Sequence, residues 1–240
     1  MPPRLTKVDE LILDQHGSLT AEDECYYLLE YTKGGGYKAS ATNQLITNLK
    51  KGNDKKGLPE YHYKAEAIET AAYNLRNTLN QALVEQATLV PIPPSACKTD
   101  PNYDDRMTKV LQALTRGVPD PDIRELIIHR ESMTPAHLSG DYRPSVAEIL
   151  ANYTIDEALT EPPPKIIVIS TTFLRLDHTS EPQRFYSPHD FLVCALQQYS
   201  LRDASLQRRK TLNCENQQGQ LDPAQTERFE VPLLQATITP

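Results

Sequence analysis

Lys165-Ile-Ile-Val-Ile169 is a continuous run of mostly β-branched residues, and Thr88-Leu-Val-Pro-Ile92 is a second short apolar run upstream of it. Runs without polar alternation are typical of strands buried on both faces of a parallel sheet. The intervening chain predicts a helix, a strand and a further helix: Asp104–Leu114, Ile123–Ile128 and Pro144–Leu150. Alternation of strands and helices predicts an α/β domain with a mainly parallel sheet over residues 87–169.

Residues 1–86, upstream of that domain, predict a helical region. Thr20 is the expected N-cap of a first helix, which the glycines at 34–36 end. A second helix is expected over Ala41–Lys50, and the strongest over Tyr63–Leu83. The last carries apolar residues at helical spacing, namely Ala67, Ala71, Leu75, Leu79 and Ala82 or Leu83.

Residues 170–240 lack the pattern of the preceding domain. They hold one glycine, Gly219, and nine glutamines, and no stretch keeps a convincing period despite the apolar run Phe191–Leu196. We therefore expect an irregular or disordered tail from about residue 171, which limited proteolysis would trim back to a core ending near Ile169.

Composition excludes several classes of protein. The chain has 240 residues and a formal net charge of −7, which argues against a general nucleic-acid binder. No apolar run approaches a membrane span, and the N-terminal residues lack the apolar core of a signal peptide. The four cysteines have no ligand-like spacing, so a disulfide framework or zinc module is not supported. A cytoplasmic globular protein is the expectation.

The loop after Thr88–Ile92 holds the first candidate site. A strand leads into Pro94, Ser95 and Lys98, and Arg106 follows at the start of the next helix. Such a loop can direct backbone N–H groups and cations at an anion beyond the strand. A proline-rich strand exit without function is the alternative, and it stays open. We interpret Asp104 and Asp105 as the acidic first turn of the helix.

The signals are weaker at Arg130, at Cys97 and at the histidines. Arg130 follows the strand Ile123–Ile128 and is a distant candidate for the same anion. Cys97 is interpreted as a packing residue, because no histidine partner is identifiable. The histidines show no metal-ligand spacing.

These residues resemble a bacterial branch of the type I phosphoribosyltransferases, similar to the competence-associated phosphoribosyltransferase-like proteins. The resemblance rests on Val90-Pro-Ile-Pro-Pro-Ser95, Tyr103-Asp-Asp-Arg-Met107, Ile123-Arg-Glu-Leu-Ile-Ile128, Ile155-Asp-Glu-Ala158 and Lys165–Ile169, and covers residues from about 20 to 169.

The resemblance implies a fold, a ligand and a reaction. The family transfers a phosphoribosyl group from phosphoribosyl pyrophosphate, with Mg²⁺ neutralising the leaving pyrophosphate. Pro94, Ser95, Lys98, Arg106 and Arg130 would lie on the pyrophosphate side. Phosphoribosyl pyrophosphate or another phosphorylated small molecule is the expected ligand, and a homodimer is left open.

The chain departs from the family immediately after Ile169. The family continues there with two acidic residues and Thr-Thr-Gly, which bind the ribose 5-phosphate, whereas this chain reads Ser170-Thr-Thr-Phe-Leu174. Codons consistent with residues 170–182 permit the missing signature in a frame displaced by one base. We interpret residues 170–240 as out-of-frame and expect the chain as printed to be inactive. The alternative is a non-catalytic interaction protein with a polar C-terminal tail.

Overall fold

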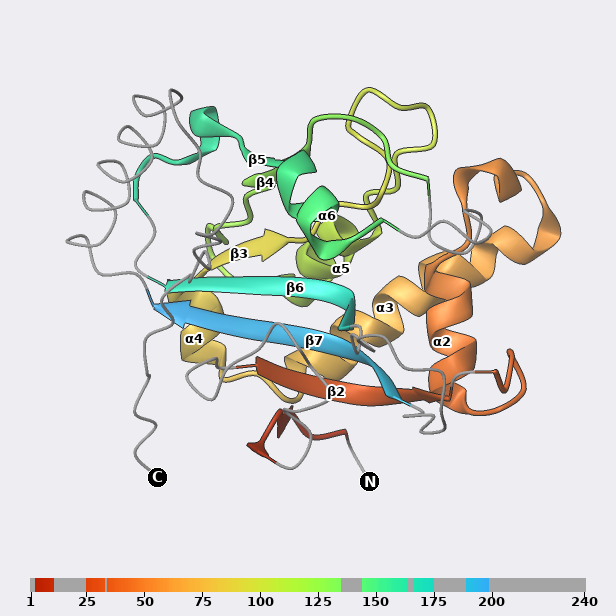
Figure 1. Ribbon diagram of the computed structural model, residues 1–240. Coiled ribbons are helices and arrows are strands. Elements are labelled where there is room, and N and C mark those ends of the chain that lie inside the picture. The colour runs from red at the N-terminus through yellow and green to blue at the C-terminus, as the bar shows by residue number, and fades with distance from the viewer. Residues whose placement is uncertain are drawn as a thin grey trace.

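Five strands form the main sheet of the molecule (Figure 1). The computed structural model describes residues 3–10, 25–32, 34–134, 144–163, 166–174 and 189–198. The order across the sheet is β1-β2-β7-β6-β3. The strand bounds are β1 Thr6–Lys7, β2 Cys25–Thr32, β3 Thr88–Pro91, β6 Ile166–Leu174 and β7 His189–Gln198.

The two strands that decide the fold in the sequence are neighbours in the sheet. β3 and β6 run parallel, with Leu89 opposite Val168. Leu89 also forms a parallel bridge to Ile123, so β3 has parallel neighbours on both sides. The chain between β3 and β6 includes helices, which supply the crossover that parallel pairing requires.

The remaining pairings make the sheet mixed. β1 with β2, β2 with β7, and β6 with β7 are all antiparallel. The expected α/β combination is therefore present, but the expectation of a mainly parallel sheet is wrong for the described strands. The reason is that β2 and β7, neither of which was expected in the sheet, supply its antiparallel half.

The first predicted helix is instead the strand β2. Its sequence is rich in tyrosine, which favours strands, and its pairing with β1 and β7 satisfies backbone groups that a helix would satisfy internally. Cys25 and Leu28 are its buried side chains. The glycines do end the element as predicted, because Gly34 and Gly36 adopt φ of 76° and 64°. The predicted cap, Thr20, lies outside the described residues.

The other helices expected within residues 1–86 are present, except that one of them is divided into two helices. The helices are α2 Ala41–Leu49, α3 His62–Arg76 and α4 Gln81–Gln86, so the helix expected over Tyr63–Leu83 is two. The Asn80 side chain accepts a hydrogen bond from the Ala82 N–H at 2.8 Å and caps α4. Thr78 donates to the Asn74 carbonyl, and such local bonds compete with a continuous helix.

The second half of the α/β region holds α5 and a small separate sheet. α5 spans Arg106–Leu114, two residues shorter than expected at its start. The strand expected over Ile123–Ile128 is divided into the bridge at Ile123 and β4, Ile127–His129. β4 pairs antiparallel with β5, Tyr153–Ile155, which follows α6, Val146–Asn152.

The expectation of an irregular tail is wrong where the tail is described. β6 continues through Leu174, and β7 lies between β2 and β6 (Figure 1). Backbone pairing along ten residues of β7 supplies the regular structure that composition did not indicate. Residues 175–188 and 199–240 lie outside the described residues, so the expectation for them stays a prediction.

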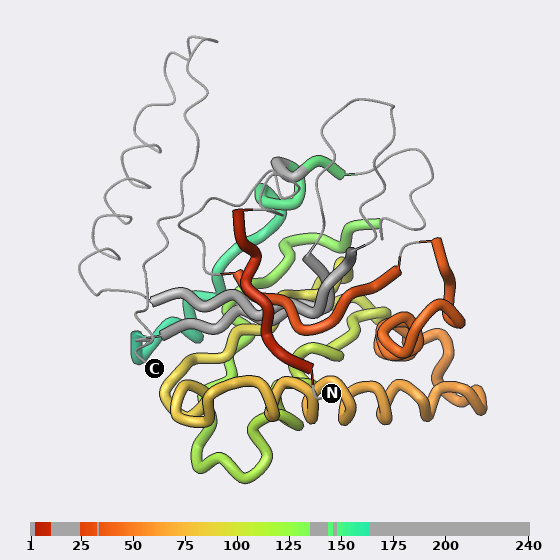
Figure 2. The backbone as a smooth tube through the Cα atoms, turned by 90° about the horizontal axis from the view of Figure 1, so that it is seen from below, coloured from red at the N-terminus to blue at the C-terminus, as the bar shows by residue number. Residues whose placement is uncertain are grey.

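The hydrophobic core joins the helices to β3. α3 packs against α2 and α5, and Figure 2 shows it lying along one face of the sheet. The predicted inward positions of α3, namely Ala67, Ala71 and Leu75, are buried, and Leu111 of α5, 1% exposed, is likewise buried. This packing holds the carboxyl end of β3 close to the start of α5, where the candidate site lies.

Candidate functional site

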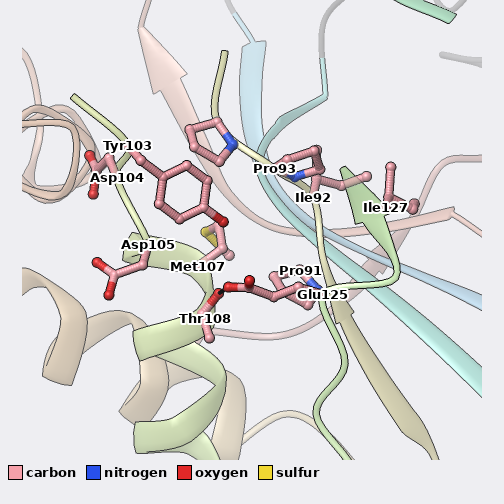
Figure 3. Close-up of a pocket in the computed structure, with 11 residues that line it drawn as sticks. Pro91, Ile92, Pro93, Tyr103, Asp104, Asp105, Met107, Thr108, Glu125 and Ile127 are labelled. Atoms are coloured by element: carbon pink, nitrogen blue, oxygen red, sulfur yellow. Dashed lines mark hydrogen bonds between the residues drawn. The ribbon is translucent and has the colours of Figure 1, made fainter. Parts of the chain in front are cut away.

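A shallow depression lies between the carboxyl end of β3 and the start of α5 (Figure 3). It holds about 210 Å³ of empty space, including space open to solvent. Its lining residues are Pro91, Ile92, Pro93, Pro94, Tyr103, Asp104, Asp105, Met107, Thr108, Glu125 and Ile127. Loops at the carboxyl ends of parallel strands are the usual ligand sites of α/β sheets.

The loop over residues 92–105 has a restrained course. Three prolines at 91, 93 and 94 restrict φ as the chain leaves β3. Further on, the Asp100 side chain accepts from the Asn102 N–H at 2.8 Å, and its carbonyl accepts from the Tyr103 N–H at 2.9 Å. This turn delivers Tyr103 to the depression.

Glu125 is the polar centre of the depression. Its carboxylate accepts a hydrogen bond from the Thr108 hydroxyl at 2.5 Å and forms an ion pair of 3.0 Å with Lys98. The Tyr103 hydroxyl also hydrogen-bonds to it and points toward it in Figure 3. Burial opposes ionisation of Glu125, but these contacts outweigh it and lower the pKa of the carboxyl.

Tyr103 is held from both ends. Burial, together with the Glu125 charge, raises the pKa of its phenol to about 12, so the hydroxyl remains a donor at neutral pH. Its carbonyl accepts from the Asn53 amide at 2.6 Å, which ties the loop to the segment before α3.

A buried charge cluster adjoins the depression, which its central residue, Asp104, also lines. Lys64 of α3 and Asp104 are 4% and 6% exposed, and their side chains are 2.7 Å apart. The Arg106 guanidinium lies 3.2 Å from the same carboxylate. Burial lowers the pKa of Lys64 more than Asp104 raises it. The interpretation of Asp104 as a first-turn residue is therefore wrong, because α5 begins at Arg106 and Asp104 links α3 to that start.

A second segment closes over the outer part of the loop. The Met133 N–H donates to the Ser95 carbonyl at 2.7 Å, and the Cys97 N–H donates to the Ser132 hydroxyl at 3.0 Å. Ser132 in turn donates to Asp100 at 2.5 Å. The Cys97 N–H, a backbone donor of this loop, is therefore already engaged.

The structure brings four of the five predicted site residues to this loop and the start of α5. Pro94 lines the depression, Ser95 is bonded through its carbonyl, Lys98 pairs with Glu125 and Arg106 pairs with Asp104. Arg130 is not among them, because its side chain is exposed and its N–H donates to the Asn152 carbonyl. Lys98 and Arg106, the two candidate cations that lie here, thus each face a carboxylate.

Sequence reasoning missed Tyr103, Thr108 and Glu125 as members of the site. The charge that interrupts the strand pattern at Glu125 was the available signal, because a carboxylate needs a partner when it is partly buried. Nothing in the pattern identified Thr108, which occupies the first turn of α5.

Cys97 has partners other than histidine. Hydrogen bonds from Ser132 and Thr99 lower the pKa of its thiol. The side chain is partly exposed in the loop, so the interpretation of Cys97 as a packing residue is not supported.

The residues present do not fit a Mg²⁺ site. Asp104, Asp105 and Glu125 are the nearby carboxylates, and each is paired with lysine or arginine. Within the described ranges, no group of three or more His, Cys, Asp or Glu side chains could hold a metal ion.

No described helix combines the length and the apolar character needed to cross a membrane.

Comparison with known proteins adds no relative. No family model matches the chain, and neither the curated proteins nor the solved structures contain a match.

His129, the last residue of β4, is expected to make the stability of the protein depend on pH. It is 8% exposed, contacts the Tyr153 ring at 4.6 Å and lies 2.9 Å from the Asn152 amide nitrogen. Burial lowers its pKa in the folded state. Its contribution is therefore fully present above the unfolded pKa of about 6.5 and is lost as pH falls through the lower folded value.

Urea unfolding between pH 8 and 5.5 checks this expectation. As pH decreases from 8 to 5.5, we expect the free energy of unfolding to decrease more steeply in the unsubstituted chain than in His129→Gln. Equal pH dependence in the two chains would contradict the expectation.

Proposed function

We propose that the chain has a phosphoribosyltransferase-like framework, whose depression beside β3 belongs to a site for phosphoribosyl pyrophosphate or another phosphorylated small molecule. The observation that carries the proposal is the position of β3 between two parallel partners, with its proline-rich loop leading into α5. In an α/β sheet, that arrangement places the loop where phosphorylated ligands bind.

We further propose that the chain as printed binds this ligand weakly or not at all. The two cations of the expected pyrophosphate side already have carboxylate partners, because Lys98 pairs with Glu125 and Arg106 shares Asp104 with Lys64. β6 remains an extended strand through Leu174, where the resemblance calls for a glycine-containing loop. A 5-phosphate needs several convergent backbone N–H donors, whereas successive N–H groups of an extended strand point in alternate directions, and β6 pairs with β7 at Thr171 and Leu174.

The chain's own residues would have a limited role in such a reaction. Lys98 and Arg106 would hold the pyrophosphate if the ligand displaced their present partners, and the prolines would hold the loop in place.

Calorimetric titration with the Mg²⁺ complex of phosphoribosyl pyrophosphate tests the proposal. Two chains are compared: the printed chain and one rebuilt with the displaced reading frame after Ile169. Loss of two or three charge-assisted hydrogen bonds, at roughly 1.5–3 kcal/mol each, predicts weaker binding by several orders of magnitude in the printed chain. We expect binding by the rebuilt chain alone.

The other outcomes separate the parts of the proposal. Micromolar binding by the printed chain would overturn the expected defect. Failure of both chains to bind would overturn the assigned ligand and favour the non-catalytic interaction protein. Lys98→Ala in the rebuilt chain is the control for the loop, and it should weaken binding there.

A further inference from the structure

Three hydrogen-bond donors converge on the single carboxylate of Glu125. Lys98 approaches from the loop, Tyr103 from the end of that loop and Thr108 from the first turn of α5. Glu125 itself comes from a separate segment, between the Ile123 bridge and β4. Tyr103 and Thr108 line the depression opposite Glu125 (Figure 3), and Lys98 reaches the Glu125 carboxylate from outside that lining.

We propose that Lys98, Tyr103 and Thr108 form a latent binding site for a phosphate-type oxyanion, which the Glu125 carboxylate fills as an internal occupant. An ammonium and two hydroxyl donors suit phosphate as well as carboxylate. The inference concerns the same depression as the proposed function. Its test uses inorganic anions only, so that either proposal can fail alone.

The charge around the depression favours an anion once Glu125 is removed. Four cationic side chains and three carboxylates occupy this region, so one positive charge is in excess, and loss of Glu125 would leave two. The cations are Lys64, Lys98, Arg106 and Lys109, and the carboxylates are Asp104, Asp105 and Glu125. The start of α5, where Thr108 lies, also favours negative charge.

The site is also within reach of solvent. The side chains of Lys98 and Glu125 are 38% and 24% exposed, so an ion could enter without opening the core. Arg106 and Lys64, by contrast, are largely buried around Asp104. A small ion would therefore meet Lys98 before either of these buried cations.

Glu125→Ala is the variant that tests the inference, with inorganic phosphate and pyrophosphate as the probes and no Mg²⁺ present. We expect it to bind phosphate at least about tenfold more tightly than the unsubstituted chain, because a repelling charge is lost and three donors are freed. Bound phosphate should also raise the melting temperature of the variant. Glu125→Gln, which keeps the side-chain shape, serves if the alanine variant fails to fold, and it should show a smaller gain.

Two controls make the result specific. Asp105→Ala removes a carboxylate that also lines the depression but pairs with Lys109, and it should leave phosphate affinity nearly unchanged. Adding Thr108→Val to Glu125→Ala should reverse most of the gain. Equal gains in Asp105→Ala and Glu125→Ala, or no gain in either Glu125 variant, would overturn the inference.

Discussion

Asp104→Ala is expected to lower the free energy of unfolding by about 3–5 kcal/mol, because it leaves a buried lysine without its counter-charge. Lys64 is 4% exposed and has its carboxylate partner 2.7 Å away. The substitution also removes the partner of the Arg106 guanidinium and the acceptor of the Arg106 N–H, 3.2 Å away. Urea unfolding at pH 7.5, followed by circular dichroism, measures the loss.

The matched control is the neighbouring aspartate. Asp105 pairs with Lys109 at 2.7 Å, but the two side chains are 43% and 50% exposed. Solvent screening makes such a pair worth about 1 kcal/mol or less, so Asp105→Ala should be mild. Comparable losses in the two alanine variants would contradict a special role for the buried cluster.

A double-mutant cycle separates the ion pair from simple loss of packing. Lys64→Met alone leaves Asp104 with Arg106, and the double variant Lys64→Met, Asp104→Ala contains no buried lysine to be left unpaired. We expect the double variant to lose less than the sum of the single losses, by about 1 kcal/mol or more. Additive losses would show that Lys64 and Asp104 act independently.

Leu75→Ala is expected to destabilise the protein by about 2–5 kcal/mol, since it opens a cavity in the core. Leu75 is 1% exposed and lies on α3, which packs against both α2 and α5. The same urea titration gives the magnitude. A cavity at this point also loosens the contact between α3 and α5, which positions the start of α5.

Tyr73→Ala is the control on the same helix. Tyr73 is 65% exposed, so its replacement should change the free energy of unfolding by about 0.5 kcal/mol or less, although it removes more atoms than Leu75→Ala. If Tyr73→Ala were as destabilising as Leu75→Ala, the assignment of Leu75 to the buried face of α3 and of Tyr73 to its exposed face would be wrong.

The helices and strands with strong local signals were predictable from the sequence. The apolar residues of α5 recur at helical spacing, and all four are buried: Met107, Val110, Leu111 and Leu114. The apolar runs identified β3 and β6. Such signals arise within a few residues, because periodicity and turn chemistry are local properties.

β2 shows where local signals mislead. The sequence before Cys25 is acidic, and the apolar residues of β2 are spaced so that they fit a helix as well as a strand. Pairing with β1 and β7, which come from elsewhere in the chain, decided between them. Strand propensity depends strongly on such neighbours, so the sequence window could not settle the question.

By itself, the sequence determined the α/β character of residues 87–169, the loop after β3 and the residue types that surround it. The tertiary structure alone decided the charge pairing there, because Lys98 meets Glu125, and Lys64 meets Asp104, across long separations in the chain. Residue spacing carries no record of which distant carboxylate reaches which cation. Those partners come within a few ångströms because α3 packs against α5 and because the chain between Ile123 and β4 passes beside the loop. Lys98, an expected anion ligand, is therefore part of an internal ion pair.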